Sequence, residues 1–317
     1  MRVHAGRRGC GKDVFAVPPR TPGSGGGSRA LPSGTAAEER PSQAGFPSRA
    51  SSSATPGTAP AGVARDPDGA PRAVQGPAGP ELDKAEFIPS LFDRIARHYD
   101  LMNIVMTAGV WRMWQRAFRR HCGIPAGAKV LDVGCGTAEL SLLLSALVGP
   151  AGRVVGVDIS PGMLAVARSK VMASGEPGRI DLLLGDALDL GFPDASFDAA
   201  ASAFVMRNVA DLDRAFAEMV RVVRPAGRIA ILELSHPPAS LIRRPFLFYF
   251  RRILPLIGTW AAKARLPVAP YAWLPRSLET FPEAEEVAAR MARAGMTDVT
   301  FRRLSAGIVC LHTARVG

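Results

Sequence analysis

The strongest constraint on the fold is an alternation of two patterns that begins near residue 128. Short apolar runs, such as KVLDV at 129–133, alternate with longer amphipathic stretches, such as ELSLLLSALVG at 139–149. Runs of this length are typical of buried strands, while the longer stretches carry helix signals such as Ser160 in an N-cap position. The alternation predicts an α/β domain with a mostly parallel sheet and helices on both faces.

The two segments that flank this region have a different character. Residues 1–80 are rich in Pro, Gly, Ser and Ala, and we expect a disordered tail there, because so few apolar side chains cannot offset the entropy of ordering. Residues 81–126 predict helices, and residues 237–282 form a proline-dotted insert that breaks the alternation. The last two apolar runs, MTDVTFRRL and AGIVCLHTA, predict an antiparallel pair of strands at a sheet edge.

Composition narrows the classes of function. The net charge is +11, but the basic residues are spread along the chain, which argues against nucleic-acid binding. The four cysteines form no CxxC pair and no zinc-type cluster, so we expect neither a structural metal nor a disulfide framework, and a reducing compartment such as the cytoplasm. No apolar run approaches the roughly 20 residues that cross a bilayer.

The motif LDVGCGTAE at 131–139 lies at a predicted strand-to-helix turn. Gly134 and Gly136 let the backbone approach a ligand closely, and the first turn of the helix offers unpaired N–H groups. A dinucleotide turn has a third glycine where this chain has Glu139, and the lysine of a phosphate-binding P-loop is absent. Taken alone, the turn is equally compatible with a plain tight turn.

Acidic residues end the next two predicted strands. Asp158 follows about 20 residues later, where a carboxylate accepts two ribose hydroxyls. Asp186, with Ala187 after it, ends the third strand, where it can meet an adenine amino group. Asp132, Asp158 and Asp186 would then follow one crevice at the carboxyl ends of the strands. The pattern favours an adenosyl ligand without phosphates.

The order of these residues resembles the class I S-adenosylmethionine-dependent methyltransferases. Within that class, several stretches of residues 84–317 resemble the UbiE/MenG C-methyltransferases of menaquinone and ubiquinone biosynthesis: HYDLMNIVMTAGVWRMW, LDVGCGTAEL, FVMRNVADLDRAF, RVVRPAGRIAILELS and SAGIVCLH. The resemblance implies a seven-stranded, mostly parallel sheet with an antiparallel last strand and an N-terminal helical cap.

The resemblance also implies roles for individual residues. S-adenosylmethionine would be bound by a set that includes the glycine turn and the strand-end acids: Asp132, Gly134, Gly136, Thr137, Asp158, Asp186, Ala187 and Ser202. The family's serine before the Phe-x-x-Arg-Asn stretch is Ala203 here, with Ser202 one position earlier, and a family histidine is replaced by Trp111. None of these departures removes a carboxylate, so we expect an active enzyme.

The implied reaction transfers a methyl group to a ring carbon of demethylmenaquinol. Arg207, Asn208 and Tyr99 are the expected catalytic residues, whereas His98 and His236 carry little weight. Because arginine stays charged, Arg207 is expected to stabilise a developing phenolate, with Asn208 orienting the ring oxygen. A base, or a water held as one, must remove the hydroxyl proton.

Partners and alternatives follow from the same resemblance. A polyprenylated quinol is dissolved in the membrane, and the insert at 237–282 would cap this substrate. Within the insert, residues 241–265 interleave arginines with aromatics. This pattern indicates either peripheral contact with the membrane or aromatic core residues beside a solvated face of arginines. The sequence is also compatible with a homodimer. The rival functions are methylation of the ubiquinone precursor, methylation of another substrate such as a phenol, lipid or sterol, and a non-catalytic cofactor-binding scaffold; a dehydrogenase fits the glycine spacing poorly.

Overall fold

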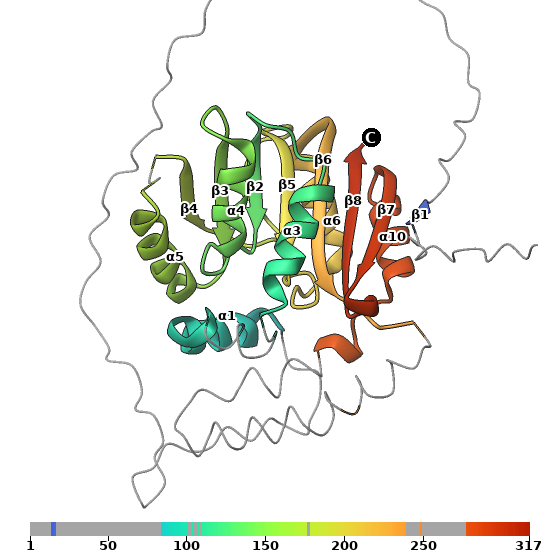
Figure 1. Cartoon of the computed structure of the whole chain (residues 1–317), viewed down its shortest axis with the longest axis horizontal. Coiled ribbons are helices and arrows are strands. Elements are labelled where there is room, and N and C mark those ends of the chain that lie inside the picture. The colour runs from blue at the N-terminus through green and yellow to red at the C-terminus, as the bar shows by residue number, and fades with distance from the viewer. Residues whose placement is uncertain are drawn as a thin grey trace, which may run out of the picture. The chain divides into compact units, whose positions relative to one another are not determined.

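The structure is a computed structural model of the chain, and it describes residues 14–16, 84–100, 103, 107, 109–175, 178–238, 248 and 277–317. Eight strands form one sheet, in the spatial order β1-β7-β8-β6-β5-β2-β3-β4 (Figure 1). Their bounds are β1 Val14–Ala16, β2 Lys129–Val133, β3 Arg153–Asp158, β4 Ile180–Leu184, β5 Phe197–Ala203, β6 Val223–Leu234, β7 Met296–Leu304 and β8 Val309–Val316.

The sheet has the direction pattern that the sequence predicts. Strands β4, β3, β2, β5 and β6 run parallel, and the last strand, β8, lies antiparallel between β6 and β7. The chain leaves β2 toward β3 and β4, then returns to add β5 on the other side of β2. Such a reversal of strand order opens a crevice at the carboxyl ends of the strands, which is where ligands bind in open α/β sheets.

Helices cover both faces of the sheet, as Figure 1 shows. The described helices are α1 Lys84–Ile95, α3 Trp111–His121, α4 Glu139–Val148, α5 Pro161–Ala173, α6 Leu212–Val222 and α10 Ala284–Arg293, with the short 3-10 helices η1 Ala96–His98 and η3 Ser305–Gly307. Buried side chains of α3, α4 and α5 share one core cluster, and those of α6 and α10 share another. Successive residues of a strand serve opposite faces, so Val130 belongs to the first cluster and Leu131 to the second.

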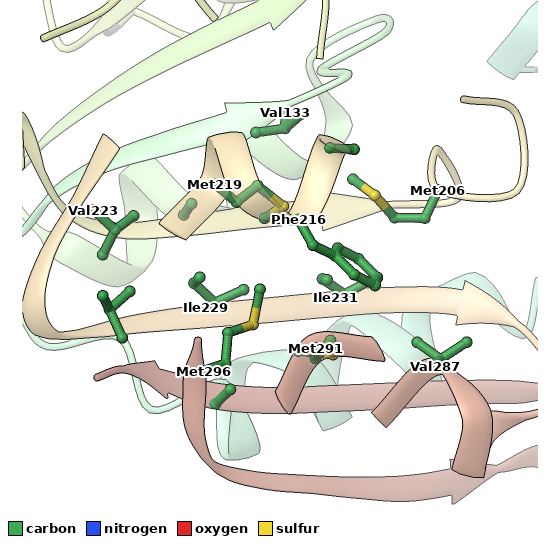
Figure 2. Packing of buried hydrophobic residues seen from close by; sticks show 14 of the residues in the cluster. Val133, Met206, Phe216, Met219, Val223, Ile229, Ile231, Val287, Met291 and Met296 are labelled. Atoms are coloured by element: carbon green, nitrogen blue, oxygen red, sulfur yellow. The ribbon is translucent and has the colours of Figure 1, made fainter. Parts of the chain in front are cut away.

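The second core is dense with long, flexible side chains. Figure 2 shows Phe216 and Met219 of α6 and Met291 of α10 converging on Ile229 and Ile231 of β6. All five side chains are essentially inaccessible to water. Burying them stabilises each by roughly 1.5–3 kcal/mol relative to exposure, and holds the sheet's carboxyl edge rigid for the site.

A short strand lies within the segment for which the sequence predicts a disordered tail. Val14–Ala16 form β1 and pair antiparallel with Arg302 to Thr300 of β7. Val-Phe-Ala has the β-prone side chains that a free sheet edge can recruit. The rest of residues 1–80 lies outside the described residues, as does most of the predicted insert at 237–282.

Local signals placed several elements correctly. Ser160 caps α5, its hydroxyl accepting from the Met163 N–H at 3.1 Å, and Gly149 ends α4 with a positive φ of 71°. Pro89 lies inside α1 rather than in its first turn. The buried Leu91 and Ile95 continue the helix beyond it, because packing of the apolar face outweighs the local cost.

Candidate active site

A cavity of about 780 Å³ opens at the carboxyl edge of the sheet. This volume suits a small molecule or cofactor together with a second ligand. Its walls come from the cap (Tyr99, Asn103), from α3 (Trp111, Trp114), from the strand ends (Gly136, Asp158, Asp186) and from the segment after β5 (Phe204, Arg207, Asn208). Residues distant in sequence thus meet around one space.

The glycine turn forms the floor of this cavity. Gly134 has a φ of +73°, and a Cβ placed there would lie 2.4 Å from Val205, so only glycine fits. Gly136 has a φ of +53°, but a Cβ there would meet nothing within 4 Å. The open space above Gly136 is room for a ligand, as the motif predicts. Thr137 follows and also lines the cavity.

Asp158 lies at the end of β3 and is held in place by backbone groups. Its two carboxylate oxygens accept from the Gly136 N–H at 2.7 Å and the Ser160 N–H at 2.9 Å. Burial raises the pKa of this carboxyl above its usual value, against those hydrogen bonds. Each carboxylate oxygen has a further lone pair, so Asp158 can accept ribose hydroxyls from the cavity that it lines.

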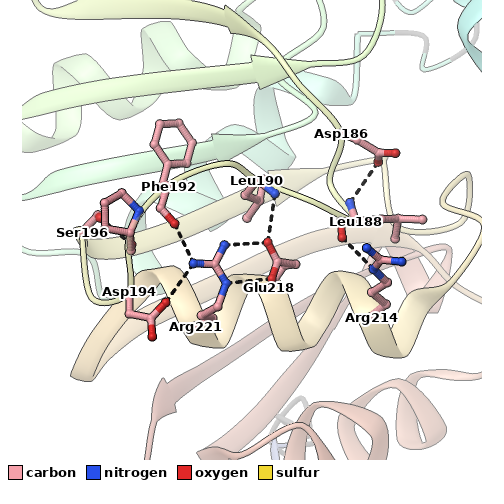
Figure 3. Close-up of polar contacts among 10 residues, drawn as sticks. Asp186, Leu188, Leu190, Phe192, Asp194, Ser196, Arg214, Glu218 and Arg221 are labelled. Atoms are coloured by element: carbon pink, nitrogen blue, oxygen red, sulfur yellow. Dashed lines mark hydrogen bonds and ion pairs between the residues drawn. The ribbon is translucent and has the colours of Figure 1, made fainter. Parts of the chain in front are cut away.

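The loop after β4 presents Asp186 and Ala187 to the same cavity. Figure 3 shows how α6 fixes this loop: Arg214 donates to the Leu188 carbonyl at 2.8 Å, Glu218 accepts from the Leu190 N–H at 2.9 Å, and Arg221 donates to the Phe192 carbonyl. The bond from Arg221 lowers the pKa of Glu218, which keeps that acceptor charged. Asp186 itself accepts from the Leu188 N–H.

Two predicted cofactor ligands lie behind the cavity wall. Asp132 is fully buried and accepts from the Ser141 hydroxyl at 2.6 Å, and burial raises its pKa to about 7. Ser202 is also fully buried and donates to the Val133 carbonyl at 2.8 Å. Neither residue is among those lining the cavity. Ala203 lines it instead of Ser202, because adjacent strand residues face opposite ways. The structure therefore places Ser202 and Asp132 behind the residues that line the cavity.

The N-terminal cap contributes Tyr99. Its hydroxyl hydrogen-bonds with Asn103, its ring makes an edge contact with Phe92 at 6.0 Å between centroids, and burial raises its pKa. A tyrosine with a raised pKa stays protonated at neutral pH. Tyr99 is therefore suited to donate a hydrogen bond in the cavity and poorly suited to be the general base. Asp100 beside it lines the cavity too, whereas Met102 lies outside the described residues.

Arg207 and Asn208 lie at the opposite wall. The Arg207 Nη1 donates to Glu233 Oε1 at 2.6 Å and to the Phe204 carbonyl at 2.8 Å. Its Nε is buried without a partner among the described residues, in a side chain that lines the cavity. Asn208 Nδ2 reaches the same carbonyl at 3.3 Å. A guanidinium held at a cavity wall is a suitable partner for a developing oxyanion.

Glu233 is a functional candidate that sequence reasoning missed. It lies near the end of β6, is 1% exposed, and accepts from the Arg207 backbone N–H and side chain and from the Leu234 N–H. The signal was available, since an acid ends the apolar run RIAILEL. A buried glutamate of this kind is expected to be paired.

Aromatic side chains build the apolar end of the cavity. Trp111 and Trp114 of α3 each lie 5.7 Å from the Phe204 ring, centroid to centroid, and Trp114 donates to the Ser305 hydroxyl at 2.8 Å. Trp111 stands where the resembled family has histidine. Large planar rings at these distances form an apolar wall suited to an aromatic ring or a hydrocarbon chain.

The remaining candidates are placed as follows. The side chain of His98 lies outside the described residues, and His236 hydrogen-bonds with the Phe281 carbonyl at 3.0 Å.

Among the described residues, no group of three His, Cys, Asp or Glu side chains could hold a metal ion. Within the same part of the chain, none of the helices combines the length and the apolar character needed to span a bilayer.

The strand order, the antiparallel last strand and a cavity at the carboxyl ends of the parallel strands together define the class I methyltransferase fold. A SAM-dependent methyltransferase from Thermotoga maritima has this fold, with a TM-score of 0.52, 16% sequence identity, and coverage of 73% of this chain and 100% of that one. The chain belongs to the ubiE/COQ5 methyltransferase family, whose profile matches residues 81–315.

Relatives of known name agree with this assignment. A protein named demethylmenaquinone methyltransferase from Symbiobacterium thermophilum is 42% identical over 238 residues, covering 74% of this chain and 94% of the relative. One named ubiquinone/menaquinone biosynthesis C-methyltransferase UbiE, from Pseudomonas paraeruginosa, is 38% identical over 233 residues, covering 74% of this chain and 90% of the relative. The family predicted from the sequence is thereby confirmed.

Proposed function

We propose that the protein methylates a ring carbon of demethylmenaquinol, using S-adenosylmethionine as the methyl donor. The observation that carries the proposal is the joint lining of one cavity by an adenosine half, with Asp158 and Asp186, and a reaction half, with Tyr99, Arg207 and Asn208. The relative with 42% identity bears the name of this activity. The cofactor half fits, because Gly136 leaves open space and Asp158 retains acceptor capacity.

S-adenosylmethionine, when bound, supplies an electrophilic methyl group on a sulfonium sulfur. Asp158 would hold the ribose, Asp186 and Ala187 the adenine, and Gly134, Gly136 and Thr137 the methionine end. Asp132 and Ser202 support this floor from behind, through Ser141 and the Val133 carbonyl. Placing the quinol carbon about 3–3.5 Å from the methyl group would supply much of the acceleration.

The reaction half activates the quinol. Loss of a hydroxyl proton to water makes the neighbouring ring carbon nucleophilic; the carbon–methyl bond forms as the methyl–sulfur bond breaks, and the ring proton then leaves to water. The Arg207 guanidinium would stabilise the phenolate oxygen, and Tyr99 would donate a second hydrogen bond. Asn208 would orient the ring, and Trp111 and Trp114 would pack against it.

A labelled-methyl transfer assay tests the proposal. Purified protein is incubated with labelled S-adenosylmethionine and either reduced demethylmenaquinone or the polyprenyl-methoxy-benzoquinol precursor of ubiquinone, with Arg207→Ala as the matched blank. Label in menaquinone at a higher kcat/KM than in the benzoquinone product supports the proposal. The reverse preference would favour the ubiquinone pathway, which the name of the 38% identical relatives includes. Cofactor binding without transfer to any quinol would favour a scaffold.

We also propose peripheral contact with the membrane, because a polyprenylated substrate is delivered from a bilayer. The segment 241–265 carries the supporting pattern of arginines and aromatics, and it lies outside the described residues apart from position 248. Co-sedimentation with vesicles that contain anionic lipid, lost on deletion of 241–257, is the expected result. Binding that is indifferent to lipid charge and survives the deletion would contradict it.

A further inference from the structure

The first part of the cap, α1 and η1, packs against helix α5. Phe92, Ile95, Ala96 and Tyr99 pack with Met163 and Val166 in a small apolar cluster. Polar anchors lie at both ends of that cluster. At one end, Asp93 Oδ1 accepts from the Ser160 hydroxyl at 2.5 Å and from the Gly162 N–H at 2.8 Å.

The second anchor lies at the end of the cap that meets the cavity. Lys170 of α5 places its Nζ 2.5 Å from Asp100 Oδ2, 2.7 Å from Glu139 Oε1 and 3.3 Å from the Thr137 Oγ1. Asp100 Oδ1 accepts in addition from the Thr137 hydroxyl at 2.7 Å. One ammonium therefore joins the cap, the glycine turn and the first residue of α4.

Lys170 is not a ligand-contacting residue. Asp100, Thr137 and Glu139 line the cavity, whereas Lys170 lies behind them, outside its lining. Its side chain is 24% exposed, against 32% for Asp100 and 43% for Glu139. The two carboxylates share this cation, so its removal would leave two like charges close together at the cavity wall.

We propose that Lys170 is a positioning residue that latches the cap over the methionine end of the cofactor. It holds Asp100 against Thr137, and thereby keeps the adjacent Tyr99 at the cavity wall. Without this cation, repulsion between Asp100 and Glu139 moves the cap outward and weakens cofactor retention. The inference rests on the proposed function for the identity of the cofactor, but its test can be read without any quinol.

The variants are Lys170→Met, which keeps the stem and removes the charge, and Lys170→Arg, which restores the charge. Arg168→Ala is the matched control, because Arg168 is an exposed cation two residues away on the same helix. The readouts are the Kd of S-adenosylhomocysteine by calorimetry, the KM for S-adenosylmethionine, and kcat at saturating cofactor. Thermal unfolding establishes that each variant is folded.

We expect Lys170→Met to raise the Kd of S-adenosylhomocysteine and the KM of the donor by roughly tenfold, the scale of a lost charge-assisted hydrogen bond. Lys170→Arg should restore most of that loss, kcat should change less than threefold, and Arg168→Ala should bind as the parent does. In a double-mutant cycle, Asp100→Asn with Lys170→Met should be no worse than the weaker-binding single variant.

Three results would overturn the latch. A folded Lys170→Met variant that binds S-adenosylhomocysteine within twofold of the parent would do so. An equal loss of affinity in Arg168→Ala would mean that the effect reflects the overall positive charge of the helix rather than this ion pair. Additive losses of affinity in the double variant with Asp100→Asn would mean that Lys170 does not act through Asp100. Failure of the proposed function is distinct from these, because it would appear as missing quinol methylation in a parent protein that still binds S-adenosylhomocysteine.

Discussion

Arg207 and Glu233 form an ion pair of 2.6 Å in which the side chains are only 9% and 1% exposed. Arg207 comes from the segment after β5, and Glu233 lies near the end of β6. Burying two charges is costly, and good geometry with additional hydrogen bonds must offset that cost. Glu233 also accepts from two backbone N–H groups, those of Arg207 and Leu234. The pair aims a fixed cation at the cavity without adding net charge to the core.

Replacing Glu233 with Gln should lower stability and turnover together. The variant leaves Arg207 buried without its counter-charge, which costs roughly 3 kcal/mol or more, and frees the guanidinium from its position. We expect a clear fall in Tm, a kcat reduced at least tenfold, and an S-adenosylhomocysteine affinity within threefold of the parent.

Asp213→Asn is the matched control for Glu233→Gln. Asp213 pairs with Arg290 at the surface and is 61% exposed, so its loss should leave Tm nearly unchanged. If Glu233→Gln keeps full kcat while Tm falls, Glu233 serves stability alone and the positioning role of the pair is refuted.

Asp158→Asn should weaken cofactor binding much more than it slows the chemical step. The amide keeps one acceptor oxygen, but it loses the charge and one of the acceptors that serve Gly136, Ser160 and the ribose. We expect a rise of about 10- to 100-fold in the KM for the donor, from the scale of charged hydrogen bonds, with kcat at saturation within fivefold. Asp181→Asn, on the neighbouring strand and 49% exposed, is the control and should leave both constants unchanged.

The sequence could predict the cofactor half because its residues are fixed by local turns. Gly134 directly follows β2, Thr137 lies in the turn between β2 and α4, and Asp158 is the last residue of β3. The structure places Ala203 in the cavity lining and the predicted Ser202 outside it, because a shift of one residue in a strand reverses the face. Position 203 is also the one that corresponds to the family's serine in the resemblance.

Long-range pairings were beyond sequence reasoning. Lys170 meets Asp100, and Glu233 meets Arg207, only because the sheet order and the docking of the cap bring their elements together. Nothing in local composition states which acid pairs with which base. The ordering of Val14–Ala16 is similar, since it depends on a free edge at β7 rather than on the segment itself.

Asp132 should make stability depend on pH near neutrality. Burial raises its pKa from 3.8 to about 7, so the folded state binds this proton more tightly than the unfolded state. The stabilisation is full below about pH 4, falls as pH rises, and is lost above about pH 7. Between pH 6 and pH 8 the free energy of unfolding should fall by about 1 kcal/mol, which corresponds to a fall of about 2–4 °C in Tm.

Asp132→Asn imitates the neutral acid and can still accept from Ser141. The Tm difference, variant minus parent, should therefore rise by about 2–4 °C from pH 6 to pH 8. Asp189→Asn, an exposed acid in the loop after β4, is the control and should give a difference that does not change with pH. A flat difference for Asp132→Asn as well would mean that Asp132 does not titrate between pH 6 and pH 8 and would contradict the prediction.

Trp111→Ala should affect the quinol and spare the cofactor. Trp111 lies against Phe204 at the apolar end of the cavity and is only partly buried, so its truncation enlarges the site with little effect on the core. Loss of an aromatic packing partner should raise the KM for the quinol by roughly 5- to 30-fold, from the scale of 1–2 kcal/mol. The S-adenosylhomocysteine affinity should stay within twofold. Met113→Ala on the same helix removes a side chain that is 48% exposed and should change neither constant.

Steady-state kinetics with demethylmenaquinols of two tail lengths separates two roles of Trp111. An equal rise in KM for both substrates means that Trp111 packs on the ring, whereas a larger rise in KM for the longer tail means that it packs on the isoprenoid chain. An unchanged KM for both would contradict the placement of the quinol beside α3.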